Sequence, residues 1–157
     1  MAERMVGLIG LGLMGEVLTA RLRAAGCEVL GTDIDPAKTA RLGALGGQAV
    51  ATASEVARRC RRIVLAVFNT DQVEDVVERG ILPAAEPGTI VLCTSTCDPD
   101  RIAALAGRLA GTALRFLETP VSGSSEQVRA GDGVGLIGGD RGTADEARDI
   151  QIGRAHV

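Results

Sequence analysis

The segment Met5-Val-Gly-Leu-Ile-Gly-Leu-Gly-Leu-Met-Gly15 decides how this chain folds. Its first five residues form an apolar run of the kind that a buried parallel strand requires. Gly10, Gly12 and Gly15 follow with the spacing G-x-G-x-x-G, and a helical periodicity covers residues 14–25. Strand, glycine turn and helix in this order are the context in which the spacing predicts a dinucleotide-binding site.

Each glycine of the turn has an expected physical role. Gly10 allows the tight turn after the strand, Gly12 lets the backbone approach a pyrophosphate, and Gly15 lets the helix pack close to the strand. The N-terminus of that helix offers free N–H groups and a partial positive charge to the phosphates. A second apolar strand ends at Asp33. An acid in that place, about 20 residues after the turn, hydrogen-bonds the adenosine ribose in a Rossmann fold.

Strands and helices alternate along the chain, which predicts an α/β fold of the Rossmann type, a doubly wound and mostly parallel sheet with helices on both faces. The expected strands are residues 5–9, 28–33, 48–50, 62–67, 89–93, 114–117 and 134–137. The expected helices are residues 14–25, 36–45, 55–60, 71–78, 98–110 and 143–150, with Ser54 capping the third and Asp71 the fourth. Ligands of such sheets bind beyond the carboxyl ends of the strands.

Length and composition fit one domain with a sizeable core. The chain has 157 residues, of which 46% are hydrophobic and 24% are charged. A net charge of −3 and the near absence of aromatic residues argue against a nucleic-acid partner. No signal peptide is visible, and no apolar run reaches membrane-spanning length. We therefore expect no nucleic-acid or membrane partner and a cytoplasmic location.

The residue types of metal sites and of amine catalysis are scarce. The four cysteines form no C-x-x-C pair, and His156 is the single histidine, so we expect reduced thiols and no metal. Lys38 is the single lysine. It follows Asp33 in the helix after the second strand, at the adenosine end of the expected site, from where its amine cannot reach a reacting carbonyl.

Three motifs, in order along the chain, resemble the β-hydroxyacid dehydrogenase family, which includes 3-hydroxyisobutyrate dehydrogenase. The first is the glycine segment. The second, Ser95-Thr-Cys-Asp-Pro99, resembles the family's S-T-x-D-P segment, and the third, Thr119-Pro-Val-Ser-Gly123, resembles its substrate loop A-P-V-S-G-G. The resemblance extends from residue 5 to about residue 150. Three ordered motifs make it far more specific than the glycine spacing alone.

The resemblance implies roles for individual residues. The residues expected to hold NAD are Gly10, Leu11, Gly12, Leu13, Met14, Gly15, Asp33, Phe68, Asn69, Val73 and Thr96. Ser122 and Gly123 would bind the carboxylate of a small substrate through a hydroxyl and a backbone N–H. NAD is expected in preference to NADP, because the Asp33 carboxylate repels a 2′-phosphate.

The sequence departs from the family at several points. Phe68-Asn69 replaces Leu-Pro, and Ser124-Ser-Glu-Gln127 replaces glycine and alanine, so the identity of the hydroxyacid or semialdehyde stays open. The family's general acid, a lysine on a long helix beyond the substrate loop, has no counterpart, so no catalytic residue is expected in this chain. The last residues, Gln151-Ile-Gly-Arg-Ala-His-Val157, resemble the translation of a sequencing-library adapter. We therefore expect a dinucleotide-binding domain over residues 1–150 and a non-native tail over residues 151–157.

The resemblance predicts that the parent protein is an oxidoreductase that transfers hydride between NAD(H) and a small β-hydroxyacid or its semialdehyde. The parent would add an all-helical domain, absent here, that carries the lysine and much of a homo-oligomer interface, so we expect the fragment itself to be inactive. Two alternatives stay open. One is an NADP-dependent imine reductase of the same architecture, against which Asp33 and the Ser122-Gly123 loop count. The other is a module that senses dinucleotides without catalysis, which has no need of Thr96 or of that loop.

Overall fold

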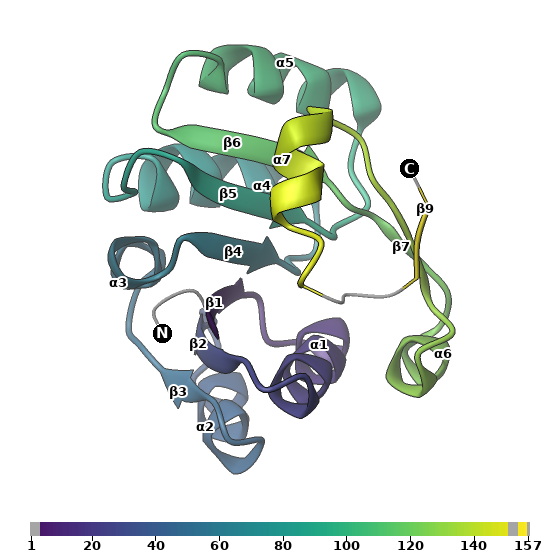
Figure 1. Ribbon diagram of the computed structural model, residues 1–157. Coiled ribbons are helices and arrows are strands. Elements are labelled where there is room, and N and C mark those ends of the chain that lie inside the picture. The colour runs from purple at the N-terminus through teal and green to yellow at the C-terminus, as the bar shows by residue number, and fades with distance from the viewer. Residues whose placement is uncertain (1–3, 151–153, 157) are drawn as a thin grey trace.

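The computed structural model describes residues 4–150 and 154–156, and Figure 1 shows a twisted sheet with helices packed around it. Six parallel strands form the sheet in the order β3-β2-β1-β4-β5-β6. They are β1 (Met5–Ile9), β2 (Glu28–Thr32), β3 (Gln48–Ala49), β4 (Arg62–Leu65), β5 (Thr89–Cys93) and β6 (Leu114–Glu118). This order is that of a doubly wound dinucleotide-binding sheet, so the predicted fold class is confirmed.

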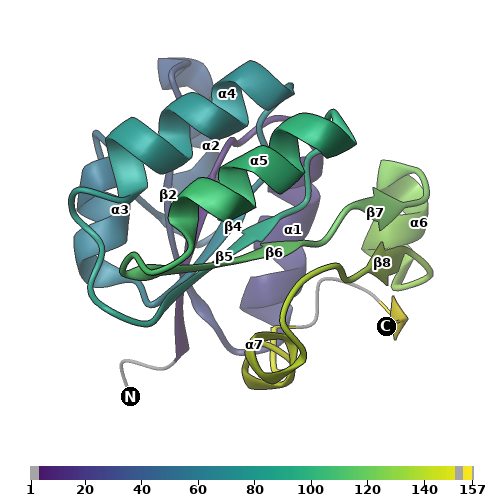
Figure 2. The same ribbon diagram turned by 90° about the horizontal axis from the view of Figure 1, so that it is seen from above.

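The core has two layers, one on each face of the sheet. Side chains alternate along β1, so that Val6 and Leu8 join one buried cluster and Ile9 joins the other. The first layer is covered by α1 (Leu13–Ala24), α2 (Pro36–Ala44), α6 (Ser125–Ala130) and α7 (Arg141–Glu146). The second layer is covered by α3 (Ala53–Arg59), α4 (Thr70–Asp75), the π-helix η2 (Val76–Ile81) and α5 (Pro99–Leu109). Figure 2 shows α3, α4 and α5 along one side of the sheet and α1 and α7 along the other.

Two helices begin at other residues than expected. Thr52, not Ser54, caps α3: its hydroxyl accepts the Glu55 N–H at 3.2 Å, and the Glu55 carboxylate in turn accepts the Thr52 N–H. The Ser54 hydroxyl donates instead to the carbonyl of Gly80 at 2.9 Å. Likewise Asn69, not Asp71, caps α4. Its side-chain oxygen accepts an N–H from the first turn, whereas Asp71 pairs with a neighbouring helix.

The π-helix and the length of α7 also differ from expectation. The helix predicted to end near residue 78 continues as η2 to Ile81. The last predicted helix, residues 143–150, begins earlier and ends earlier: α7 follows Asp140, whose carboxylate accepts the Thr143 N–H and hydroxyl at 2.8 and 2.9 Å, and ends at Glu146. These bonds lower the pKa of Asp140.

A second, smaller sheet, which the sequence did not lead us to expect, joins β7 (Val121–Ser122), β8 (Val134–Leu136) and β9 (Arg154–His156). β7 and β8 are antiparallel, and between them lies the unexpected helix α6, which packs against α1. Ser124 and Gln127, which both lie in the stretch that departs from the family pattern, form its capping box. β9 pairs in parallel with β8 and belongs to the segment that we expect to be non-native, of which residues 151–153 and 157 lie outside the described residues.

Candidate dinucleotide-binding site

A cavity of about 730 Å³ opens at the carboxyl ends of β1, β2 and β4. The strand order reverses there, since the chain passes from β1 to β2 on one side and later to β4 on the other. This is the point at which doubly wound sheets bind their ligands, and the volume falls within the range of cofactor sites. The cavity is lined by Ile9, Gly10, Gly12, Leu13, Met14, Thr32, Asp33, Ile34, Lys38, Ala51, Thr52, Ala53, Ala66, Val67, Phe68, Gln72, Asp75 and Val76.

The glycine turn forms the floor of this cavity. Gly10 has a φ of +96°, and a Cβ on it would lie 2.4 Å from the carbonyl oxygen of Ala66. A Cβ on Gly15 would lie 2.2 Å from the carbonyl oxygen of Gly10, so α1 can approach the turn only with glycine there. Over Gly12, among the described residues beyond its chain neighbours, a Cβ would meet nothing closer than the Lys38 ammonium at 3.9 Å. The space over Gly12 is therefore open to a ligand.

The charges around the turn favour an anion. Gly12 is the N-cap of α1 and has no side chain, so the first N–H groups of the helix are left for a ligand. Glu16 in the first turn would oppose an anion, but Arg41 binds both of its carboxylate oxygens, at 2.9 and 3.1 Å. Lys38 lines the cavity beside the turn and has no ion pair within the described part of the chain. Its ammonium would lie 3.9 Å from a Cβ on Gly12, so Lys38 adjoins the glycine turn, whereas the sequence led us to expect it at the adenosine end of the site.

Asp33 joins the end of β2 to the glycine turn. One carboxylate oxygen accepts the Leu11 N–H at 2.7 Å, and the other accepts the Asp35 N–H at 2.8 Å. Each carboxylate oxygen has a second lone pair, so the group can still accept a hydrogen bond from a ribose hydroxyl. Asp33 thus shapes the turn and is also available to a ligand.

Three large apolar side chains are exposed around the mouth of the cavity. Ile34 is 94% exposed, Phe68 is 88% exposed and Leu13 is 67% exposed. All three line the cavity. Apolar side chains gathered in this way at a concave surface mark a binding site, because a ligand that covers them removes apolar area from water.

The structure brings only part of the expected cofactor set together. Gly10, Gly12, Leu13, Met14, Asp33 and Phe68 line the cavity, Leu11 contributes an N–H, and Gly15 allows the close helix packing. Asn69 lies at the cap of α4. Val73 is fully buried in the core, and Gln72, Asp75 and Val76 of the same helical segment form the cavity wall in its place.

Several lining residues were missed from the sequence. Ala51, Thr52 and Ala53 follow the end of β3, where we expected no contact with the cofactor. The pattern Thr52-Ala-Ser-Glu55 is a capping-box signature and would have placed the helix start at this edge of the sheet.

The segments expected near the nicotinamide and the substrate lie at the ends of β5 and β6. The Thr94 hydroxyl donates to the Leu65 carbonyl at 2.6 Å, and the Ser95 hydroxyl donates to the Val67 carbonyl at 2.7 Å, which fixes the loop after β5 to the end of β4. Thr96, Ser122 and Gly123 are exposed and are not among the residues that line the cavity.

Thr119 lies at the end of β6, where its N–H donates to the Cys93 carbonyl at 2.8 Å. Its hydroxyl is buried and has no hydrogen-bond partner among the described residues.

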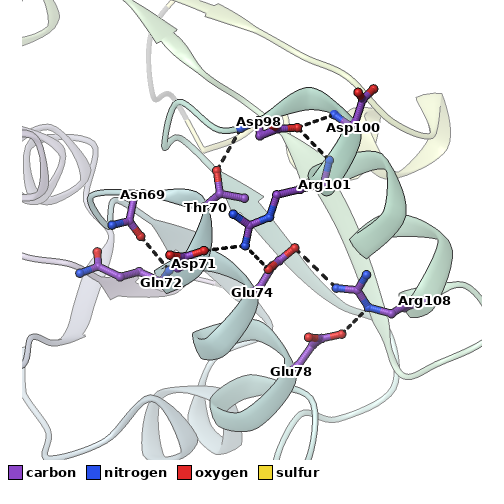
Figure 3. A network of polar contacts seen from close by, with 10 residues as sticks. All are labelled: Asn69, Thr70, Asp71, Gln72, Glu74, Glu78, Asp98, Asp100, Arg101 and Arg108. Atoms are coloured by element: carbon purple, nitrogen blue, oxygen red, sulfur yellow. Dashed lines mark hydrogen bonds and ion pairs between the residues drawn. The ribbon is translucent and has the colours of Figure 1, made fainter.

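A polar network ties the loops after β4 and β5 to each other, as Figure 3 shows. The Asp98 N–H donates to the Thr70 hydroxyl at 3.0 Å. Arg101 on α5 binds Asp71 at 2.6 Å and Glu74 at 2.5 Å on α4, and these carboxylates raise the pKa of its guanidinium. The network holds the two helix starts together and so positions the loops that precede them.

No group of three His, Cys, Asp or Glu side chains in the described part of the chain is placed to bind a metal ion. None of the described helices combines the length and the apolar character needed to cross a membrane.

Comparison with known proteins agrees with this geometry. Residues 5–153 match the NAD binding domain of 6-phosphogluconate dehydrogenase. The chain is 32% identical to L-threonate dehydrogenase of Cupriavidus necator, over 94% of this chain and 50% of that protein. A crystal structure of 3-hydroxyisobutyrate dehydrogenase from Salmonella typhimurium is 29% identical, with a TM-score of 0.87, over 97% of this chain and 54% of that one. An imine reductase from Pseudomonas sp. has a TM-score of 0.88 over 98% of this chain and 54% of that one, but at 19% identity it shows the fold alone.

The chain spans about half the length of the relatives that it matches. The resemblance to β-hydroxyacid dehydrogenases, predicted from three motifs, is confirmed by these dehydrogenases. The chain therefore belongs to the family of the NAD binding domain of 6-phosphogluconate dehydrogenase, together with the corresponding domains of hydroxyacid dehydrogenases.

Proposed function

We propose that this chain is the NAD-binding part of an oxidoreductase that transfers hydride between NAD(H) and a small β-hydroxyacid or its semialdehyde. The observation that carries the proposal is the cavity at the ends of β1, β2 and β4, where the glycine turn, Asp33 and Lys38 lie together. The relatives named as L-threonate and 3-hydroxyisobutyrate dehydrogenases support the reaction class.

The residues of the cavity fit NAD. The space over Gly12, the free N–H groups of α1 and the Lys38 ammonium suit a pyrophosphate. The Asp33 carboxylate suits the hydroxyls of the adenosine ribose, and the exposed side chains of Ile34 and Phe68 suit the flat rings of a dinucleotide. When bound, the nicotinamide supplies the hydride chemistry.

The substrate side of the proposal rests on the loop after β6. The Ser122 hydroxyl and the Gly123 N–H would bind a substrate carboxylate, and Thr96 would contact the nicotinamide half. Their support is the motif resemblance and their position after β5 and β6, whose carboxyl ends lie at the same edge of the sheet as the cavity. A small carboxylate substrate suits this pair of donors.

The proton donor of the reaction is assigned to the parent protein. Lys38 lies beside Gly12 on the phosphate side, so the general-acid lysine would belong to an all-helical domain that follows residues 1–150 and forms a homo-oligomer interface. The support is that the relatives are about twice as long as this chain. A non-native origin of residues 151–157 and a cytoplasmic location belong to the same proposal, and the full gene would test the first directly.

A preference for NAD over NADP follows from the Asp33 carboxylate. Two like charges about 4 Å apart repel by about 1–4 kcal/mol between water and a protein surface, so a 2′-phosphate beside Asp33 would weaken binding. The test is titration of the chain with NADH and with NADPH, followed by nucleotide fluorescence. The chain has no Trp or Tyr, so protein emission does not overlap the signal.

The informative variant is Asp33→Asn, because its amide oxygen can still accept the Leu11 N–H that holds the turn, while its NH2 group gives up only the bond from the Asp35 N–H. If the variant only loosens the turn, the affinities for NADH and NADPH should fall by the same factor. If it removes direct recognition of the ribose, the ratio of the two affinities should shift away from NADH. Asp35→Asn is the matched control, since it removes a neighbouring charge that does not line the cavity. Tighter binding of NADPH by the unaltered chain would overturn the assignment of NAD.

A further inference from the structure

Two of the four thiols lie side by side under the loop that carries Thr96. Cys93 is the last residue of β5 and is buried, and Cys97 is half-buried at the other end of the loop. Both thiols approach the same acceptor, the carbonyl oxygen of Ser95, with sulfur–oxygen distances of 4.0 Å for Cys93 and 3.5 Å for Cys97. Both sulfur atoms therefore lie beside one backbone oxygen, and the Cys97 thiol contributes to the raised pKa of Cys93.

We propose that Cys93 and Cys97 are a redox-sensitive dithiol that a low-molecular-weight disulfide, such as oxidised glutathione, converts into a disulfide within the loop. The pair has what such a site needs, namely one thiol that an oxidant can reach and a second thiol beside it that resolves the first product. Cys27 and Cys60 are each buried on other elements and lack this combination.

The exchange has two steps and balances without another reactant. The Cys97 thiolate attacks one sulfur of the small disulfide, whose S–S bond breaks and releases one thiolate. The Cys93 thiolate then attacks Cys97 Sγ, which forms the loop disulfide and releases the second small thiolate. The protein loses two electrons, the small disulfide gains them, and the two protons of the thiols pass to the released thiolates.

The surroundings of Cys93 determine the rate of the second step, in which the loop disulfide forms. Burial and the neighbouring Cys97 thiol raise the pKa of Cys93 to about 12, and the carboxylate of Glu118, its partner across to β6, adds to this. The Ser95 backbone bond opposes the shift. Cys93 is therefore almost entirely protonated at neutral pH, so closure of the disulfide should be slow and should accelerate as the pH rises.

The disulfide should alter the position of Thr96. In the reduced chain the Ser95 carbonyl accepts from both thiols, while Thr94 and Ser95 bind the end of β4. Forming the S–S bond removes both S–H donors and draws Cys97 toward β5. Thr96 lies between the fixed residues and Cys97, so we expect weaker cofactor binding, a step that rests on the proposed function.

Peptide mass reports the disulfide directly. The chain is incubated with oxidised glutathione, unfolded, treated with iodoacetamide and digested with trypsin. Residues 80–101 form one tryptic peptide with both thiols, and Cys27 lies in a separate peptide of residues 24–38. The expected result is a peptide 80–101 that lacks two hydrogens and carries no alkyl group, with Cys27 fully alkylated. Full alkylation of peptide 80–101, or a stable glutathione adduct on Cys97, would overturn the proposal.

NADH titration reports the consequence for the loop. Oxidised chain should bind NADH about tenfold more weakly than reduced chain, and dithiothreitol should restore the affinity. Cys97→Ser should show no response to oxidant, whereas the control Cys27→Ser should respond like the unaltered chain. Equal affinity of both forms would overturn the coupling to Thr96. Failure of both forms to bind NADH would overturn the proposed function and leave the mass result standing.

Discussion

The two halves of the candidate site differ in how far this chain encloses them. At the ends of β1, β2 and β4 lies the cavity of about 730 Å³, and the backbone of the glycine turn forms its floor. The Gly10 N–H donates to the Thr32 carbonyl at 3.1 Å and so joins this floor to the end of β2. At the ends of β5 and β6, Thr96, Ser122 and Gly123 are exposed and lie outside that cavity. The first half is thus built by the central strands, and the second depends on a loop and a two-residue strand.

The difference follows from what each half must recognise. Phosphates and ribose are bound by backbone N–H groups and one carboxylate, which strands and a helix start supply by themselves. A reacting carbonyl needs a positioned proton donor and a site closed to water, which take side chains from further structure. Cofactor binding and chemistry should therefore separate in experiments on this chain.

The largest expected effect is the absence of turnover. We expect the chain, alone or cut after residue 150, to bind NADH but not to oxidise it with a panel of small semialdehydes. General acid catalysis typically contributes 10²–10⁴-fold, and Lys38 lies beside the glycine turn instead of the substrate loop. NADH absorbance follows the reaction. Turnover comparable to that of an intact family member would show that the second half is complete without further structure.

The next largest effect concerns the turn itself. Gly15→Ala would place a Cβ 2.2 Å from the Gly10 carbonyl oxygen, so backbone must move, and we expect a loss of about 3 kcal/mol in the free energy of unfolding. Urea denaturation measures it. Gly107→Ala on α5 is the matched control. No described atom outside the helix backbone lies within 4 Å of the new methyl, so this substitution should stabilise the helix by about 1 kcal/mol. A loss well below 3 kcal/mol for Gly15→Ala would mean that the backbone of the glycine turn can shift to accommodate the methyl group.

The sheet and the first half could be predicted from local sequence. Parallel strands buried on both faces appear as continuous apolar runs, and the glycine spacing stands beside one of them. Of the second sheet, the strand predicted over residues 134–137 is confirmed by β8, whereas β7 has two residues, too short to show a period, and was not predicted.

The misplaced details depend on contacts that are distant along the chain. Ser54 and Thr52 are both good caps, and the choice between them involves a bond from Ser54 to the carbonyl of Gly80. Similarly, Val73 faces the core while Gln72 and Val76 face the cavity. The rotation of a short helix is set by what packs beneath it, which the segment's own sequence does not reveal.

A moderate effect should distinguish the second half from the first. Ser122→Ala in the full-length parent should raise the KM for an acid substrate, because loss of one charge-assisted hydrogen bond costs roughly 1.5–3 kcal/mol. The NADH affinity of this chain should stay the same, since Ser122 is exposed and lies outside the cavity lining. Steady-state kinetics and NADH titration measure the two quantities. Equal damage to NADH affinity would move Ser122 into the cofactor site.

A comparable effect in the first half should come from Gly12→Ala. The added methyl is tolerated by the fold, because Lys38 Nζ at 3.9 Å is the nearest described atom beyond the chain neighbours, but it occupies the space proposed for the pyrophosphate. We expect a loss of at most about 1 kcal/mol in the free energy of unfolding, because alanine is a poorer N-cap than glycine, and a loss of about 1–3 kcal/mol in NADH binding. Thermal unfolding without ligand and NADH titration check both parts. Unchanged affinity would place the pyrophosphate away from Gly12.

The smallest effect tests whether the Thr119 hydroxyl in the second half is unpaired in the absence of ligand. The Thr119 hydroxyl is buried without a partner among the described residues, and an unpaired buried hydroxyl costs about 1 kcal/mol or more. Thr119→Val should therefore raise the free energy of unfolding by about 1 kcal/mol. Thr94→Val is the matched control and should lower it by about as much, because the Thr94 hydroxyl, also buried, donates to the Leu65 carbonyl at 2.6 Å. Urea denaturation of both variants gives the comparison. If both variants lower the free energy of unfolding, a water molecule bonds the Thr119 hydroxyl. If Thr119→Val is stabilised but binds NADH more weakly, the Thr119 hydroxyl contacts the ligand, as the most deeply buried contact of the second half.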